Sequence, residues 1–143
     1  MRRVAKSVLW FILVGICTHE IQALLSSFLL AFDGNFEMRP IWQRDRELQA
    51  SLFFLECAGV FFIAGAVLVA PYGLRAKAAV ATAFLFGTLF SALFVLGPYG
   101  LAYSHAPLWL DILGYSPFFV PPFAAIFGAL AIRQLRKTRA VVT

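Results

Sequence analysis

The sequence is poor in charged residues and in the side chains that most metalloenzymes use as ligands. Only 13% of its 143 residues are Asp, Glu, Lys or Arg, whereas 62% are hydrophobic. A soluble domain has about a quarter of its residues charged. This shortage of charge excludes an ordinary soluble domain, because so much apolar surface needs lipid as its solvent. We therefore expect an integral membrane protein.

Cysteine and histidine are too few and too scattered for a metal or haem site. Cys17 and Cys57 form no CxxC pair and match no zinc-binding spacing. Both lie in apolar segments, where a cysteine usually behaves as a small hydrophobe. His19 also lies in such a segment and His105 lies in a predicted loop, so they make no pair of haem ligands. We expect no cofactor and no metal.

Long apolar runs predict four membrane-spanning helices. A hydrocarbon core of ~30 Å needs about 20 apolar residues, and the segments of that length are 7–30, 51–70, 78–96 and 116–135. The start "MRRVAKSVLWFILVG" is similar to a signal peptide, but no small-residue cleavage site follows it, so we interpret it as a retained first helix. The predicted fold class is an all-α integral membrane protein, with one four-helix transmembrane bundle over residues 1–143.

Basic residues predict the orientation of this bundle. They gather in the N-terminal tail, in the turn after the second span and in the C-terminal tail. In the first outer loop, about 31–50, three arginines are offset by four acids, and the alternating charges of "QRDRELQ" suit a short surface helix. The positive-inside rule then places both termini in the cytoplasm. Orientation also explains the net charge of +5, so we discount nucleic acid as a partner. The membrane would be the endoplasmic reticulum in a eukaryote and the inner membrane in a bacterium.

Two acidic residues inside predicted spans are the main functional signal. Glu20 lies in "ICTHEIQALL" and Glu56 in "SLFFLECAGVFF". A charge near the bilayer centre costs about 2.5–3.5 kcal/mol on insertion scales, and two carboxylates in a low dielectric cannot easily both ionise. Because the first two spans are antiparallel neighbours, we expect the two acids to converge around a shared proton or a bound cation. The alternative is that both are protonated and bonded to other helices.

Polar neighbours give the expected acid site partial support. His19 is about 100° and Gln22 about 200° around the helix from Glu20, so neither shares its face fully. Thr18 in the first span, and Thr88 and Ser91 in the third span, can supply hydroxyl groups.

The fourth span opens with an aromatic and proline-rich run, "GYSPFFVPPF". Pro121 and Pro122 remove backbone donors, and a broken backbone at membrane depth is tolerated where it is buried in protein or lines a cavity. Aromatic faces attract cations. The run therefore predicts a pocket wall that includes Tyr115, Phe118, Phe119 and Phe123; a kinked packing helix without a ligand is the alternative.

Small residues four apart predict close helix packing in the third and fourth spans. They are Ala83, Gly87 and Ser91, then Ala124 with Gly128 and Ala125 with Ala129. Such spacing lets helix backbones approach in lipid. The pattern leaves open whether the contact is within one chain or between two.

Together these residues resemble the EXPERA family, which includes sigma-2 receptors and emopamil-binding sterol isomerases. The resemblance rests on the order and spacing of "HEIQALL", "SLFFLECAGVFF" and "GYSPFFVPPF", and it covers most of the chain. It implies a lipid-facing pocket for sterols or cationic amphiphiles, with Glu20 as the ammonium partner and Glu56 in support, and it implies a homodimer. The family's sterol isomerases have a histidine where this chain has Ile16, which disfavours sterol isomerisation here.

Three functions fit these features. The leading one is the binding of a sterol-like, terpenoid or cationic amphiphilic ligand at Glu20 and Glu56. The alternative is an acid–base isomerase or cyclase that acts on a sterol or polyprenyl alkene, with the same two glutamates transferring protons. A small proton-coupled exporter is third, because the long outer loop and the second acid fit it less well. The sequence does not decide whether the protein is an enzyme.

Overall fold

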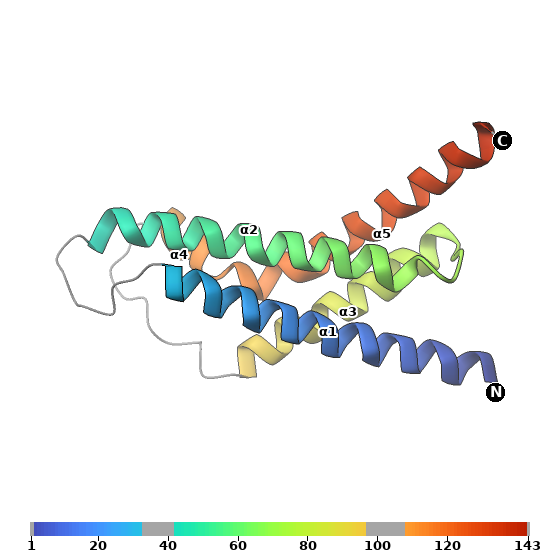
Figure 1. The fold of residues 1–143 in the computed structure, drawn as a ribbon, viewed down its shortest axis with the longest axis horizontal. Coiled ribbons are helices and arrows are strands. Elements are labelled where there is room, and N and C mark those ends of the chain that lie inside the picture. The colour runs from blue at the N-terminus through green and yellow to red at the C-terminus, as the bar shows by residue number, and fades with distance from the viewer. Residues whose placement is uncertain (1, 33–41, 97–107, 143) are drawn as a thin grey trace.

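The computed structural model describes residues 2–32, 42–96 and 108–142, and the regular structure in these ranges is entirely helical. Its long helices are α1 (Arg2–Phe32), α2 (Trp42–Val69), α3 (Ala76–Leu96) and α5 (Ser116–Val142), and a short helix, α4 (Leu108–Gly114), precedes α5. Figure 1 shows the long helices lying along one another. We call the end where α1 ends and α2 begins the loop end. The opposite end, which holds both termini and the α2–α3 turn, is the basic end.

Each long helix contains a stretch that is long and apolar enough to cross a membrane. These stretches are Arg3–Phe28, Ala50–Val69, Ala76–Leu93 and Ser116–Ala140. The prediction of four helices of spanning length is thereby confirmed. The helix expected in "QRDRELQ" is present, but it is longer than predicted, because these residues form the first turns of α2. No proline interrupts residues 42–69, so the charged turns run directly into the apolar span.

Helix α5 is the centre of the bundle, because it makes the most extensive contacts with both α2 and α3. Gly65 of α2 lies against the backbone of Ala125, and Gly128 of α5 lies against the carbonyl group of Phe62. A β-carbon at either glycine would overlap those backbone atoms. The small residues predicted in this part of the chain therefore serve packing within one chain.

The contact between α3 and α5 joins a glycine to a pair of prolines. Gly87 lies against the backbone of Pro121 and Pro122, both of which are buried. Helix α5 continues through this pair. The expected broken backbone along a cavity is therefore wrong: the missing β-carbon of Gly87 leaves room for the two prolines, and the helix packs there tightly.

Helix α1 is the most loosely packed of the four spans. Its ring of Phe11 meets Phe86 of α3 edge-on with centroids 5.3 Å apart, and Trp10 Nε1 donates a hydrogen bond to the carbonyl oxygen of Leu68 at 3.2 Å. Even so, only 17% of the apolar stretch of α1 is buried, compared with 39%, 33% and 39% for α2, α3 and α5.

The basic end is organised by the turn between α2 and α3. Pro71 follows the end of α2, and Gly73 has a φ of 53°, a conformation that favours glycine. Tyr72 Oη donates to the carbonyl oxygen of Lys6 at 3.4 Å, which ties α1 to this turn. Figure 1 shows both termini at this end and the C-terminal half of α5 leaving the bundle.

Candidate functional site

The buried face of α1 is a stripe of residues at four-residue spacing. Val14, Thr18 and Gln22 are buried, and Ser26 is half-buried. Thr18 Oγ1 donates to the carbonyl oxygen of Val14 at 2.6 Å, so its hydroxyl is bonded within the helix. From Thr18 to Ser26 the stripe is polar, which is unusual for a helix face that meets the rest of a bundle in lipid.

Glu56 of α2 is the carboxyl group that this stripe meets. Its side chain is buried, with the residue only 9% exposed. Ser26 Oγ donates a hydrogen bond of 2.7 Å to Glu56 Oε1, whereas Oε2 is buried and has no hydrogen-bond partner. The site therefore combines one bonded and one unbonded carboxyl oxygen, and Oε2 can still accept a hydrogen bond.

Two further buried hydroxyl groups occur on neighbouring helices. Among the described residues, the buried side-chain polar atoms without a partner are Glu56 Oε2, Ser91 Oγ and Ser116 Oγ. Ser91 lies one turn beyond Gly87, which contacts Pro121, so it is level with the first turn of α5, where Ser116 lies. Buried polar groups are usually hydrogen-bonded. The loop-end half of the bundle thus contains several buried polar groups that can still form hydrogen bonds, and they come from three helices.

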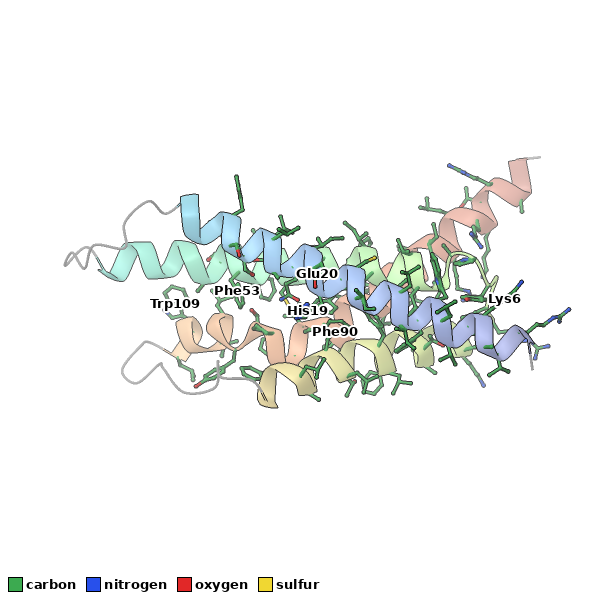
Figure 2. All side chains as sticks on the ribbon, turned by 60° about the horizontal axis from the view of Figure 1, so that its bottom comes forward. Lys6, His19, Glu20, Phe53, Phe90 and Trp109 are labelled. Carbon is green, nitrogen blue, oxygen red and sulfur yellow. The ribbon has the colours of Figure 1, made fainter. Side chains whose placement is uncertain are left out.

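Glu20 is not in this interior, which corrects the expected pairing with Glu56. Its side chain is 68% exposed and that of the adjacent His19 is 69% exposed, with His19 Nδ1 3.5 Å from Glu20 Oε1. The reason is helical phase: Glu20 lies two residues, or about 200°, from both Thr18 and Gln22 on the buried stripe. Figure 2 shows His19 and Glu20 near the middle of α1, between Lys6 at the basic end and Trp109 at the loop end.

Several other predicted site residues also face outward. Thr88 is exposed, because the buried positions of α3 around it are Phe86, Gly87, Phe90 and Ser91. On α5, Phe119 and Phe123 are exposed. The expected inward wall of aromatic rings is therefore wrong at these positions, because the small residues and prolines of α5 occupy its packed face.

The aromatic residues at the start of α5 form a small pair. Tyr115 is exposed and Phe118 is half-buried, and their ring centroids lie 5.6 Å apart. Of the predicted site residues, the structure thus places Glu56 and Gln22 in the interior, Phe118 at its edge, and Glu20, His19, Thr88, Tyr115 and Phe119 on the exposed surface. Within the described ranges no group of three His, Cys, Asp or Glu side chains could hold a metal ion.

Sequence reasoning missed two of the residues that contact Glu56 or share its depth: Ser26 and Ser116. The signal for Ser26 was present in the sequence, because Thr18, Gln22 and Ser26 recur at the four-residue spacing of one helix face. Ser91 was predicted both as a small packing residue and as a source of a hydroxyl group, and its side chain is buried. Nothing in the local sequence marks Ser116 as buried, since it is the first residue of α5.

No family model, curated protein or solved structure matches this chain.

Proposed function

We propose that this protein is a four-span membrane protein that binds a hydrophobic ligand, either a sterol- or terpenoid-like molecule or a cationic amphiphile, through the carboxyl group of Glu56. One observation carries the proposal: a buried carboxyl group with Oε1 bonded to Ser26 and Oε2 without a partner. Such a group inside a membrane marks a functional site more often than a packing contact.

The chemistry of the carboxyl group favours a ligand with a hydrogen-bond donor. A bare carboxylate is costly in a low dielectric, so Glu56 needs either a proton or a cation. A ligand ammonium group meets this need, because it donates a hydrogen bond to Oε2 and its positive charge neutralises the carboxylate. A ligand hydroxyl group can donate to the same oxygen. The cationic amphiphile is therefore the ligand class expected to bind most tightly.

The loose packing of α1 supports a route to Glu56 from the lipid. Neither hollow described for this structure borders Glu56, so a ligand must displace side chains to reach it. The least buried span is α1, and the hydrogen bond from Ser26 joins it to Glu56. Movement of the loop-end half of α1 would open the space between α1 and α2. Trp10, bonded to Leu68, would hold the basic-end half in place.

Binding is favoured over isomerisation because only one of the two predicted acids, Glu56, is buried. An isomerase or cyclase that shuttles a proton between two carbons needs a group to deliver the proton and a group to remove it. Glu56 is buried and Glu20 is exposed, so the two do not form the enclosed pair that this mechanism would use. The acid–base enzyme accordingly stays the second proposal.

The test compares two single substitutions that remove the same charge. The probe is a fluorescent cationic amphiphile with a tertiary amine and a steroid-like body, titrated into purified protein in detergent. We expect Glu56→Gln to weaken binding about ten- to a hundredfold, the equivalent of one charge-assisted hydrogen bond. Glu20→Gln is the matched control and should leave the affinity within about twofold. Equal losses in both variants, or a loss in Glu20→Gln alone, would contradict the proposal.

The exposed pair of His19 and Glu20 supports the second part of the proposal, a homodimer. The bonds from Trp10 to Leu68 and from Ser26 to Glu56 set α1 against α2 and put Glu20 roughly 18 Å below the loop end of the α2 span. In a hydrocarbon core of ~30 Å crossed by this span, that depth would be close to the centre. Lipid chains offer no hydrogen bonds at that depth. A two-fold axis along the membrane normal would bring a second copy of the pair to the same depth.

Cys17 provides the test of this dimer, because it is exposed on α1 while Cys57 is buried. Cys17 is one turn from Glu20 on the same side of the helix. We expect oxidative cross-linking in membranes to give a covalent dimer that Cys17→Ser abolishes and Cys57→Ser retains. A protein that stays monomeric under these conditions would contradict the dimer.

A further inference from the structure

Two shallow hollows flank α5 at the basic end of the bundle. The larger, of about 630 Å³, lies between Phe62 of α2, Ala76 at the start of α3 and the face of α5 that runs from Phe127 to Lys137. The smaller, of about 160 Å³, lies between α5 and the α2–α3 turn at Gly73. Arg133 and Lys137 line both hollows, so the same two cations serve the two sides of α5.

The lining of the larger hollow changes from apolar to cationic along α5. Phe127 and Leu130 line one end of it along α5, and Arg133 and Lys137 line the other end. Ten residues of helix separate Phe127 from Lys137, a rise of about 15 Å, which is half of the ~30 Å hydrocarbon core. The hollow thus follows the part of α5 that leaves the bundle, with its cations toward the C-terminal end of the helix.

The charges around the hollows are of one sign. Arg133 is half-buried, Lys137 is exposed, and Arg136 lines the smaller hollow. The sequence has no Asp or Glu in residues 1–19, 57–110 or 112–143, which supply every segment of the basic end. Ala76 also brings the first turn of α3, whose backbone N–H groups favour an anion.

From this arrangement we propose that the hollows flanking α5 bind an anionic phospholipid, with the phosphate between Arg133 and Lys137 and an acyl chain along Phe62 and Phe127. The rings of Phe62 and Phe127 are exposed, so the apolar part opens directly to lipid. A zwitterionic lipid fits less well, because its ammonium group would meet further cations and no carboxylate. This site is at the opposite end of the bundle from Glu56 and does not depend on the ligand proposed there.

The experiment measures lipid retention by native mass spectrometry on the full-length protein. The probes are phosphatidylglycerol, phosphatidylcholine and inorganic phosphate. We expect phosphatidylglycerol to be retained over phosphatidylcholine, and the double variant Arg133→Gln/Lys137→Gln to lower that retention about tenfold. The matched control, Arg3→Gln/Lys6→Gln, removes two charges from the same end but from neither hollow, and it should retain the lipid as the wild type does.

A second variant separates loss of the site from loss of the fold. Arg133→Lys/Lys137→Arg keeps both charges and should keep most of the preference for phosphatidylglycerol. Equal losses in the site variant and in the Arg3/Lys6 control would mean that a diffuse positive field attracts the lipid, and would overturn the proposal. Displacement of the lipid by inorganic phosphate at equal concentration would also overturn it, because the apolar wall would then contribute nothing.

Discussion

At the scale of single residues, the central feature is that the two carboxyl oxygens of Glu56 differ in their hydrogen bonding. Oε1 accepts the hydroxyl proton of Ser26, and Oε2 is buried without a partner. Leaving a buried acceptor unbonded costs about 1–3 kcal/mol. Ionisable residues inside membrane-spanning segments commonly mark functional sites. This cost is the physical reason for assigning the ligand to Glu56.

The bond between Ser26 and Glu56 leads to the first stability prediction. We expect Ser26→Ala to lower the free energy of unfolding in detergent by about 1–3 kcal/mol, because Oε1 loses its donor in a buried site. Ser27→Ala is the control, since Ser27 Oγ donates to the carbonyl oxygen of Ala23 in its own helix and is exposed. It should change the stability by no more than about 0.5 kcal/mol. Similar losses in both variants would show that the bond to Glu56 stabilises nothing.

The burial of Glu56 could be predicted from the sequence more successfully than its partner could. Burial of Glu56 follows from its place within an apolar span. The outward orientation of Glu20 could not be predicted in this way. Helix α1 is apolar on nearly all sides, so its hydrophobic pattern does not indicate which face is buried. The polar residues indicate the buried face instead, because Thr18, Gln22 and Ser26 form one stripe along α1 and Glu20 lies outside it. The family resemblance, which assigned the ammonium partner to Glu20, stays a prediction.

At the scale of helices, backbone contact through glycine holds α2 and α5 together. Gly65 and Gly128 each lie against backbone atoms of the opposite helix, and Gly87 does the same for α3 and α5. In lipid there is little hydrophobic gain from joining two apolar helices, so close packing supplies much of the attraction. These three glycines are therefore structural requirements.

Two glycines of α2 give a matched pair for the second stability prediction. Gly65→Ala places a β-carbon on the backbone of Ala125, so we expect a loss of about 1–3 kcal/mol or more from the separation of α2 and α5. Gly59 has no atom within 4 Å of its β-carbon position. Gly59→Ala should leave stability unchanged or raise it by up to about 1 kcal/mol, because alanine favours the helix. Both are measured by unfolding in mixed micelles, and a loss at Gly59 equal to that at Gly65 would contradict the packing.

The helices themselves could be predicted from the sequence, and their ends could not. Length and apolarity identified all four spans, since no other feature of the sequence competes with them over about 20 residues. The continuity of α2 back to Trp42 was missed, because alternating charges suit a short surface helix as well as the first turns of a longer one. The prolines of α5 were misjudged for another reason. A helix tolerates them when the neighbouring helix offers a glycine, and that contact is not local in sequence.

At the scale of the whole molecule, charge and packing both divide the bundle into two ends. The basic end contains Lys6, Arg75, Arg133 and their neighbours, and the loop end contains the buried carboxyl and hydroxyl groups. This division supports the proposal that the basic end faces the cytoplasm, because cytoplasmic segments are enriched in Lys and Arg. It also separates the proposed lipid site from the proposed ligand site.

The orientation is tested by cysteine labelling on a background that lacks Cys17 and Cys57. Lys137→Cys, at the basic end, should react with a membrane-impermeant maleimide only after the cells are permeabilised, because the reagent then reaches the cytoplasmic side. Asn35→Cys, between α1 and α2, should react in intact cells or vesicles. Asn35→Cys leaves Arg133 and Lys137 unchanged, so its labelling does not depend on the proposed lipid site. The reverse pattern of labelling would contradict the orientation.

The most direct test of the role of Glu56 is infrared difference spectroscopy of the protein with and without a cationic amphiphile. When the ligand's amine group reaches Glu56 in its neutral form, it takes the carboxyl proton and becomes an ammonium group paired with the carboxylate, so the carboxyl stretching bands change. We expect this change in the wild type and in Glu20→Gln, and its loss in Glu56→Gln. A carboxyl change that persists in Glu56→Gln and vanishes in Glu20→Gln would place the ligand on the outer face of α1 and contradict the account.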